Sequence, residues 1–383
     1  MHKLRVGYTC NIRDNCRAED ERYSEWEPPE TVEAVVTALV DAGCEISVID
    51  VGPDIFHVLE RRRSELDLIF NNAEGLEEGE LREAIVPFCC EQLGIPHTGS
   101  TPKTFINALD KATAKRLVAY DGVTTPRFQV MRSVGDPLLP DLVFPLMVKP
   151  DREGTSIGIT QASKIYDVHA LRTQVERILD TYHQPALVEE FIDGTEYTIG
   201  LVGSYVLPIL AVDLTKIPGQ PFVRDAHVKE IDTAFSDSLS FDVAPDRYRA
   251  FAAAAVRAHA ALEALDYNRM DFRARDGALY FLEANPIPGI GYAVYHRTIQ
   301  TYHLDTIVVD RARRGEGIGT GLLASIRAAL REAAPVILNV VTDATASETL
   351  AFYRRSGFVV AGYVKDEFLP GVIQAHLTLE VRR

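Results

Sequence analysis

A chain of 383 residues that is 46% hydrophobic and 25% charged has the composition of a globular protein and room for two or three domains. Because 55 Asp and Glu outnumber 40 Lys and Arg, the formal net charge of -15 excludes a general affinity for nucleic acid or for an anionic membrane. The sequence has no apolar run of about 18 residues and no signal-peptide core at its start, which predicts a cytoplasmic protein. None of the five cysteines has CxxC spacing, so we expect reduced thiols and no metal site built on sulfur.

Residues 1–104 alternate strand and helix patterns in the way that a parallel sheet requires. The expected elements are a strand at 4–8, a helix at 30–42, and strands at 46–49 and 66–70. Ligands at such sheets bind beyond the carboxyl ends of the strands. We therefore predict ligand contacts within residues 8–27 and 71–78 of this α/β lobe.

Residues 105–298 have a different pattern, in which strands are separated by long polar loops, as in an α+β domain. The expected elements are strands at 143–149 and 186–191, a helix at 248–265, and a strand pair at 268–273 and 278–284. The strand pair flanks an Asp-Gly turn signal and carries most of the acidic side chains discussed next.

In this hairpin, the two-residue period of a strand puts Arg269 and Asp271 on one face, and Glu283 and Asn285 on one face. A three-residue loop at 275–277 would place Arg269 opposite Glu283 and make the three oxygen-bearing side chains converge. Such a trio beside an arginine suits Mg²⁺ that carries phosphate. A two-residue loop would instead put the carboxylates on opposite faces, and a solvated hairpin with incidental charges is the alternative.

Two lysines occupy positions that phosphate binding would require. Lys149 ends an apolar strand, where a lysine is rare unless its ammonium has a partner, and Lys111 begins a helix-like segment. The loop 153–158 contains Thr155 and Ser156 and can close over a triphosphate, although a lone Gly-Thr-Ser loop is more often an ordinary turn.

A strand followed by a hinge at Glu189, Glu190 and Ile192 offers backbone groups to an adenine edge, and Glu196 is placed to accept hydrogen bonds from ribose hydroxyls. Taken singly, Glu189 and Glu190 are expected to be ordinary surface residues. The interest of these positions lies in their order along the chain.

Over residues 1–298 these segments, in this order, resemble the ATP-grasp superfamily and most closely the D-alanine-D-alanine ligase group. The matching motifs are Leu109-Asp110-Lys111, Val148-Lys149-Pro150 with Arg152-Glu153-Gly154-Thr155-Ser156, Val188-Glu189-Glu190-Phe191 with Glu196, and Arg269-Met270-Asp271 through Glu283-Ala284-Asn285 to Pro288-Gly289. The resemblance implies an α/β and α+β architecture, with an ATP-grasp domain at 105–298 after a Rossmann-like lobe at 1–104.

The resemblance also implies roles for individual residues. ATP would be bound by Lys111 and Lys149 at the phosphates, by Thr155 and Ser156 above them, by Glu189, Glu190 and Ile192 around adenine, and by Glu196 at the ribose. Asp271, Glu283 and Asn285 would ligate two Mg²⁺ ions, Arg269 and the Gly289 amide would steady the reacting oxygens, and Lys229 would be brought to the γ-phosphate by a mobile loop.

The implied reaction activates a carboxylate as an acyl phosphate, which an amine then attacks to give an amide, ADP and phosphate. Such a site needs charge neutralisation and alignment rather than a covalent nucleophile. Two departures bear on the substrate: Glu25 is the nearest equivalent of the group's early glutamate, and Asn72 with its neighbours replaces the expected histidine. We therefore favour amino acids or small carboxylates other than those of a D-alanine-D-alanine ligase proper, which is kept as an alternative.

Residues 299–383 resemble part of a GNAT N-acetyltransferase. The segment Arg311-Ala312-Arg313-Arg314-Gly315-Glu316-Gly317-Ile318-Gly319 is similar to that family's RxxGxG loop, which binds the pyrophosphate of acetyl-CoA at a helix start. The implied contacts are Arg314, Gly315, Gly317 and Gly319, and Tyr353 matches the tyrosine that acts as an acid toward the thiolate. Both resemblances are truncated at the junction 298–304, so a packing or dimerisation module is the alternative to acetyl transfer.

Three hypotheses follow from these patterns: an ATP-dependent carboxylate-amine ligase, an acetyl-CoA-dependent N-acetyltransferase, and a nucleotide-binding regulatory protein without turnover. The first is favoured, with small molecules as partners, no nucleic acid or membrane partner, and a homodimer as a further possibility.

Overall fold

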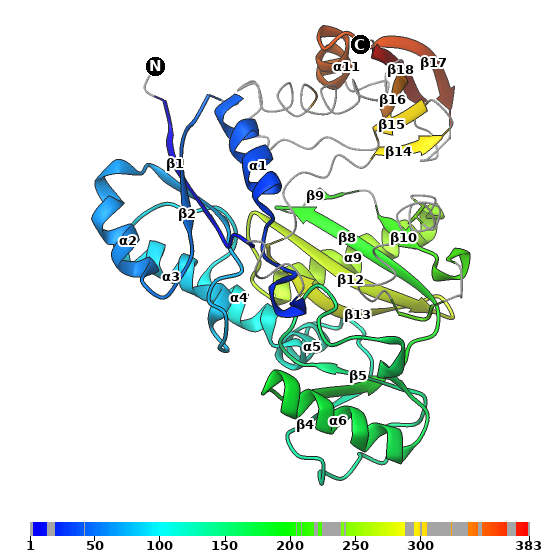
Figure 1. Cartoon of the computed structure of the whole chain (residues 1–383). Helices are drawn as coiled ribbons and strands as arrows, with labels where there is room; N and C mark the ends of the chain where they lie inside the picture. Colours follow the sequence, from blue (N-terminus) through cyan, green and yellow to red (C-terminus); the bar gives the residue numbers. More distant parts are fainter. Residues whose placement is uncertain are drawn as a thin grey trace. The chain divides into compact units, whose positions relative to one another are not determined.

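The computed structural model describes residues 3–13, 20–41, 43–203, 205–207, 209–217, 221–223, 239–240, 243–287, 295–298, 301–304, 323, 336–343, 347–365 and 373–381 (Figure 1). The chain divides into two compact units. The larger comprises His2–Glu33 and Ile46–Pro288, and the smaller comprises Met1, Ala34–Glu45 and Gly289–Arg383. The three-part division at residues 104 and 298 stays a prediction.

The N-terminal part of the larger unit contains a three-stranded sheet in the order β2-β1-β3. Its elements are β1 (Arg5–Cys10), β2 (Glu45–Asp50), α2 (Ile55–Arg62), β3 (Leu68–Asn72) and α3 (Ile85–Leu93), and α1 (Pro29–Asp41) lies between β1 and β2 in sequence. Strands β1 and β3 are parallel, with Cys10 opposite Asn72 at their carboxyl ends. Ile69 on β3 packs in one apolar cluster with Leu59 of α2 and Val86 of α3.

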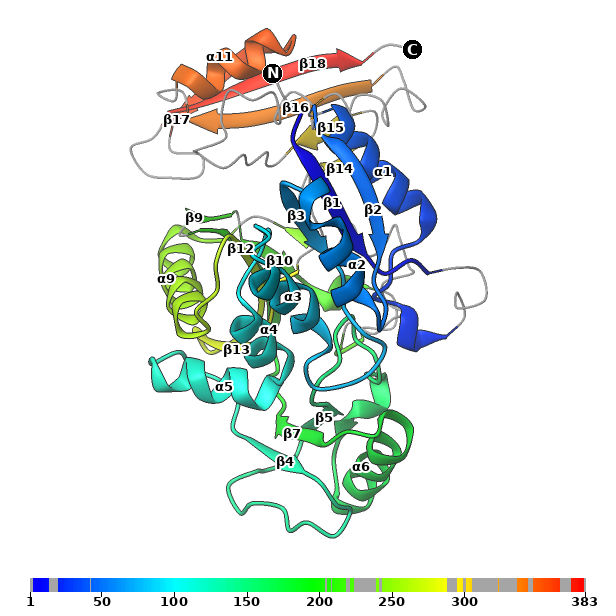
Figure 2. The same ribbon diagram turned by 90° about the vertical axis from the view of Figure 1, so that its left-hand side faces the viewer.

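The next part of this unit is a four-stranded antiparallel sheet in the order β4-β7-β5-β6, with α6 packed on β5 and β7 (Figures 1 and 2). Its elements are β4 (Phe128–Met131), β5 (Leu146–Pro150), β6 (Lys164–Ile165), α6 (Val168–Tyr182) and β7 (Ala186–Glu190). All five residues of β5 are buried, including its last polar residue, Lys149. A lysine at the end of a buried strand requires a partner for its charge, and that partner comes from β7.

The third part is a six-stranded antiparallel sheet in the order β11-β10-β8-β12-β13, with β9 paired to β8. Its elements are β8 (Thr195–Val202), β9 (Tyr205–Val206), β10 (Leu210–Val212), β11 (Leu239–Ser240), β12 (Tyr267–Arg275) and β13 (Ala278–Asn285), accompanied by α4 (Pro102–Leu109), α5 (Lys111–Tyr120) and α9 (Pro245–Ala261). One face of the sheet packs on α5 and α9 through Met270, Phe272 and Phe281. The opposite face of β12 and β13 is left for polar side chains, because side chains alternate along a strand.

The β12–β13 hairpin corrects the expected register. Its loop has two residues, Asp276 and Gly277, both with positive φ, as in a type I′ turn, rather than the three that we expected. A two-residue loop alone would separate the carboxylates, but a bulge at Leu282 shifts the pairing by one residue. Asp271 therefore lies directly opposite Glu283, and Arg269 lies opposite Asn285 instead of Glu283.

The smaller unit contains a five-stranded sheet in the order β14-β15-β16-β18-β17 (Figure 2). Its elements are β14 (Tyr295–Thr298), β15 (Thr301–Leu304), β16 (Val336–Asp343), α11 (Ser347–Arg355), β17 (Val359–Lys365) and β18 (Ile373–Val381). Only the β15–β16 pair is parallel among these described strands. Across the described ranges of both units, every helix is too short or too polar to span a membrane.

Candidate active site

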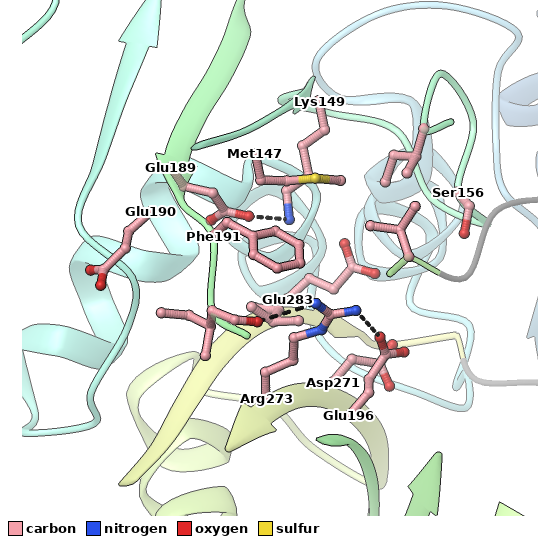
Figure 3. A pocket seen from close by; sticks show the side chains of 14 residues that line it. Met147, Lys149, Ser156, Glu189, Glu190, Phe191, Glu196, Asp271, Arg273 and Glu283 are labelled. Atoms are coloured by element: carbon pink, nitrogen blue, oxygen red, sulfur yellow. Dashed lines mark hydrogen bonds and ion pairs between the residues drawn. The ribbon is translucent and has the colours of Figure 1, made fainter. Parts of the chain in front are cut away.

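A pocket opens between the two antiparallel sheets of the larger unit, and each sheet supplies one wall (Figure 3). Strands β5 and β7 supply Met147, Lys149, Glu189 and Glu190, while β12 and β13 supply Asp271, Arg273, Leu282 and Glu283. The pocket encloses about 640 Å³, including space open to solvent.

On the first wall, one buried carboxylate holds two lysines. Glu189 lies 2.8 Å from the ammonium of Lys149 and 2.8 Å from that of Lys115, which belongs to α5. Burial by itself raises the pKa of Glu189, but the two ammonium groups hold that pKa below its usual value. Burial likewise lowers the pKa of Lys149, and the nearby Glu189 and Glu283 outweigh it, so the pKa of Lys149 is raised. This wall therefore carries a fixed positive charge into the pocket.

The hinge that follows β7 lines the same pocket through Glu190, Phe191 and Ile192. The Glu190 carboxylate points away from Lys149 and Arg273 (Figure 3), and it pairs with Arg275 at 2.7 Å. The carboxylate of Glu190 is thus engaged by an arginine outside the pocket lining. The adenine contact expected of the hinge backbone stays a prediction.

Arg273 connects the hinge with the expected ribose residue. Its guanidinium donates to the Ile192 carbonyl at 3.2 Å and to Glu196 at 3.4 Å, and it lies 5.2 Å from the centre of the Phe191 ring. A third hydrogen bond reaches the Phe222 carbonyl at 2.6 Å. One buried arginine therefore fixes the hinge, Glu196 and the segment of Phe222 around the same end of the pocket.

On the opposite wall, the register places Arg269, Asp271, Glu283 and Asn285 on one face. Asp271 accepts a hydrogen bond from Thr198 at 2.8 Å and lies 3.3 Å from Arg269. Burial alone raises the pKa of Glu283, but the charges of Lys111 and Lys149 lower it to about 2. Glu283 therefore stays ionised near neutral pH.

This donor set fits a hard divalent cation. Within the part of the chain that is described, no three His, Cys, Asp or Glu side chains form a metal-binding group by themselves. Two carboxylates with the Asn285 amide would leave several positions of Mg²⁺ to water and phosphate, which is the usual manner of magnesium binding. The Asn285 oxygen accepts one hydrogen bond, from the Ile287 amide at 2.9 Å, and it retains a second lone pair.

The loop after β5 lies at the mouth of this pocket. Ser156 lines the pocket, and both Thr155 and Ser156 have positive φ. Lys111, the first residue of α5, donates to the Glu153 carbonyl and lies 3.5 Å from Glu283. It thus joins the loop to the carboxylate wall.

The two candidate substrate residues are placed differently. Glu25 packs against this loop, because a Cβ on Gly154 would come within 1.9 Å of its carboxylate. Asn72 ends β3 and donates to Tyr8 at 3.3 Å and to Glu27 at 3.1 Å. Neither residue belongs to the described lining of the pocket.

Several expected site residues lie outside the described residues. They are Lys229, Gly289, Arg314, Gly315, Gly317 and Gly319. Tyr353 is described in α11, where its ring packs edge-on against Phe352 and Phe358. Burial raises the pKa of its hydroxyl to about 12.

Sequence reasoning missed two cations of the larger unit, although each had a detectable signal. Lys115 follows Lys111 by four residues on a helix, which puts both on one face. Arg273 follows Asp271 by two residues on a strand, which puts both on the pocket side. Neither residue belongs to the motifs on which the resemblance to the ligase group rests.

Comparisons with known proteins give two family matches. The model described as the D-ala D-ala ligase C-terminus matches residues 116–315, and the acetyltransferase (GNAT) domain model matches residues 275–360. The chain is 34% identical over 263 residues to the D-alanine–D-alanine ligase of Syntrophotalea carbinolica, covering 68% of this chain and 81% of that protein. It is 33% identical over 260 residues to the D-alanine–D-alanine ligase of Pseudomonas fluorescens, covering 67% and 76%.

Solved structures share the fold. The D-alanine–D-alanine ligase from Bacillus anthracis complexed with ATP has a TM-score of 0.59 and 21% identity, covering 85% of this chain and 96% of that one. The VanG D-Ala:D-Ser ligase from Enterococcus faecalis has a TM-score of 0.57 and 18% identity, covering 75% and 91%. At these identities the likeness concerns the fold of the chain.

Proposed function

Because the chain belongs to the D-alanine–D-alanine ligase family of ATP-grasp enzymes, we propose that its pocket binds ATP with Mg²⁺ and uses them to join a carboxylate to an amine. The ATP-grasp fold and the ligase family expected from the sequence are confirmed by the comparisons. The same comparisons show an ATP-dependent amide-bond ligase.

One observation supports the proposal most directly: the two walls of the pocket carry complementary groups. Lys149 lies on one wall, and the carboxylates of Asp271 and Glu283 lie on the other. A polyphosphate placed between them would meet an ammonium on one side and cation-binding carboxylates on the other. Magnesium, when bound, would neutralise phosphate charge and align the transferred group.

The protein's own residues would have these roles. Lys149 and Lys111 would bind phosphates, the hinge at Glu189 to Ile192 would contact adenine, and Glu196 would accept from the ribose. Thr155 and Ser156 would exclude water, which would otherwise hydrolyse an acyl phosphate. Arg269 would steady oxygens of the reacting phosphoryl group. Lys229 and the Gly289 amide, which lie outside the described residues, keep their predicted roles.

The substrate class proposed is an amino acid or a small carboxylate as acyl donor, and an amino acid as the attacking amine. The similar proteins are named for D-alanine and D-serine, so D-alanine–D-alanine ligation is the alternative within this class. Glu25 and Asn72 are the candidate substrate contacts. ADP release with single and paired amino acids, followed by mass spectrometry of the products, identifies the pair.

The test of the site uses two conservative variants. We expect Asp271→Asn and Glu283→Gln each to reduce ADP formation by at least about 1,000-fold, because each removes a charge that would hold the cation. The melting temperature should change little, since both carboxylates face the pocket rather than the core. Substantial turnover in both variants would refute the assignment of these residues, and no ADP release by the native protein across the panel would refute the ligase function.

A second activity is proposed for the C-terminal part because the GNAT model matches residues 275–360. Acetyl-CoA would be the donor, with Arg314, Gly315, Gly317 and Gly319 at its pyrophosphate and Tyr353 as the acid. Transfer of labelled acetyl groups to amino acids without ATP tests this activity. Domain boundaries at 104 and 298, a homodimer and a cytoplasmic location stay predictions from the sequence.

A further inference from the structure

The charged side chain of Lys115 has no solvent-exposed surface and does not line the pocket. Its side chain is fully buried, and its ammonium lies 2.8 Å from Glu189, 3.1 Å from the Phe281 carbonyl and 3.2 Å from the Thr125 hydroxyl. An ammonium has three N–H donors, and three acceptors surround this one. Burying a charge is costly, and an apolar residue of similar size would fill the same space. Packing alone therefore does not explain a charged residue at this position.

The contact with Glu189 changes the charge that the pocket presents. Lys149 and Glu189 alone would form a neutral pair, which attracts a phosphate weakly. Lys115 pairs with the second oxygen of Glu189, so the cluster of three side chains has a net charge of plus one. Of the two lysines, Lys149 is the one that lines the pocket, as the hinge residues also do (Figure 3). The buried lysine thus restores the charge that Glu189 would cancel.

The contact with Phe281 bears on the other wall. Phe281 immediately precedes the bulge at Leu282, which brings Glu283 opposite Asp271. Its amide donates to the Thr124 carbonyl at 2.8 Å, and its carbonyl accepts from Lys115 and from Thr125 at 3.0 Å. These bonds hold the strand where its pairing changes register.

We propose that Lys115 is a positioning residue that serves both walls of the pocket: it sustains the charge of Lys149 through Glu189, and it holds the bulge that aims Glu283. The inference rests on the proposed function, in which the pocket binds nucleotide phosphates. Lys115 itself does not touch the ligand, so removing it should act only through these two routes.

The first test measures ADP binding by calorimetry in the presence of EDTA, where only the charge route operates. We expect Lys115→Met to weaken metal-free ADP binding by at least about tenfold, because a unit of positive charge is lost beside Glu189, the ion-pair partner of Lys149. Thr125→Val is the matched control, since it removes a bond to the same Phe281 carbonyl and one acceptor of Lys115 but no charge, and it should bind metal-free ADP within about twofold of the native protein. Equal binding by native protein and Lys115→Met would overturn the charge route.

A double-mutant cycle tests whether the effect passes through Lys149. In a Lys149→Met background, Lys115→Met should weaken metal-free ADP binding by less than about twofold more. An undiminished loss in that background would overturn the proposal. If Lys115→Met does not fold, Lys115→Gln, which keeps hydrogen-bond donors without the charge, provides the same comparison, and thermal unfolding of each variant establishes that it is folded.

The second route, through the bulge that aims Glu283, is tested by measuring the Mg²⁺ concentration that gives half-maximal ADP formation. Both Lys115→Met and Thr125→Val should raise it by at least about threefold, because both loosen the bulge before Glu283. An unchanged Mg²⁺ requirement in both would overturn this route. Native protein that binds no ADP at all would instead refute the proposed function, whereas native binding with an indifferent Lys115 would refute the present inference alone.

The pH profile adds a readout that a purely structural residue would not affect. Burial lowers the pKa of Lys115 to about 8, opposed by Glu189 on β7, while Lys149 on β5 lowers it and Glu283 on β13 raises it. Above pH 8 the cluster loses its net charge, so metal-free ADP binding by the native protein should weaken between pH 7 and pH 9. The corresponding loss should be smaller in Lys115→Gln, and the same loss in both proteins would contradict the charge route.

Discussion

The larger unit contains two buried charge clusters of opposite composition. In the lysine cluster, Lys115 and Lys149 share the single carboxylate of Glu189. In the arginine cluster, the single guanidinium of Arg82 forms ion pairs with the carboxylates of Glu25 at 3.3 Å, Glu83 at 3.0 Å and Glu153 at 3.4 Å. Both clusters are buried, yet one has an excess of positive charge and the other an excess of negative charge.

The difference appears in the protonation of the carboxylates. The pKa of Glu189 lies below its usual value despite burial, because two ammonium groups favour its charged form. Burial raises the pKa of Glu83 to about 7 even though Arg82 lowers it, and burial raises the pKa of Glu153 in the same way. The number of opposing charges, rather than burial, decides the direction of the shift. The lysine cluster therefore keeps its charge near neutral pH, whereas Glu83 of the arginine cluster binds a proton there.

The largest effect on stability is expected from removing the one cation of the arginine cluster. Arg82→Met would leave three carboxylates with no guanidinium, and breaking a buried pair in this way costs about 3–5 kcal/mol. Chemical denaturation at pH 8 measures the loss. At pH 5 the loss should be smaller, because Glu83 is then protonated. A loss below about 1 kcal/mol at pH 8 would show that the cluster is not held by its charges.

An intermediate effect is expected when one carboxylate is made neutral. The pKa of Glu83 is higher in the folded protein than in the unfolded chain, so this group favours folding at low pH, and that contribution is lost as the pH rises toward 7. Glu83→Gln should therefore leave stability nearly unchanged at pH 5 and increase it at pH 8 by on the order of 1 kcal/mol. Unfolding curves at the two pH values check the sign. Destabilisation at pH 8 would mean that the pair with Arg82 outweighs the burial of the charge.

The smallest effect is expected at an exposed ion pair of the same unit, which serves as the reference for both clusters. Lys103 and Glu263 pair on the surface, with side chains that are 62% and 61% exposed. Lys103→Met should change the free energy of unfolding by less than about 1 kcal/mol, because solvent and salt screen such pairs. A loss as large as that of Arg82→Met would imply that burial is not what separates strong from weak pairs in this protein.

Many of the candidate site residues could be predicted because the neighbouring sequence marks their positions at the end of a strand or the start of a helix. Lys149 closes a fully buried strand and Lys111 begins a helix, and both positions are recognisable from neighbouring residues alone. The hairpin of Asp271 and Glu283 could also be located from its Asp-Gly turn. The common face of these two acids was predicted correctly, although the loop length assumed for it was wrong.

The remainder depended on contacts between segments far apart in the chain. The bulge at Leu282 has no mark of its own in the sequence, because the backbone of the preceding Phe281 is held by the Thr124 carbonyl and the Lys115 side chain. Arg82 and Glu153, which form an ion pair, are 71 positions apart in the sequence. Such pairings follow from how the sheets and helices pack, and local periodicity does not encode them.

The bulge also has a bearing on how this hairpin can vary. Leu282 is the extra residue of the bulge, so a relative that lacks one residue at this position would pair Glu283 with Asp271 in a regular ladder and keep both acids on the same face. Regular pairing of Leu282 itself with Asp271, without the bulge, would instead turn Glu283 to the apolar face. A one-residue gap between Phe281 and Glu283 is therefore expected among relatives that retain both acids, and an alignment that allows no gap there would mismatch them.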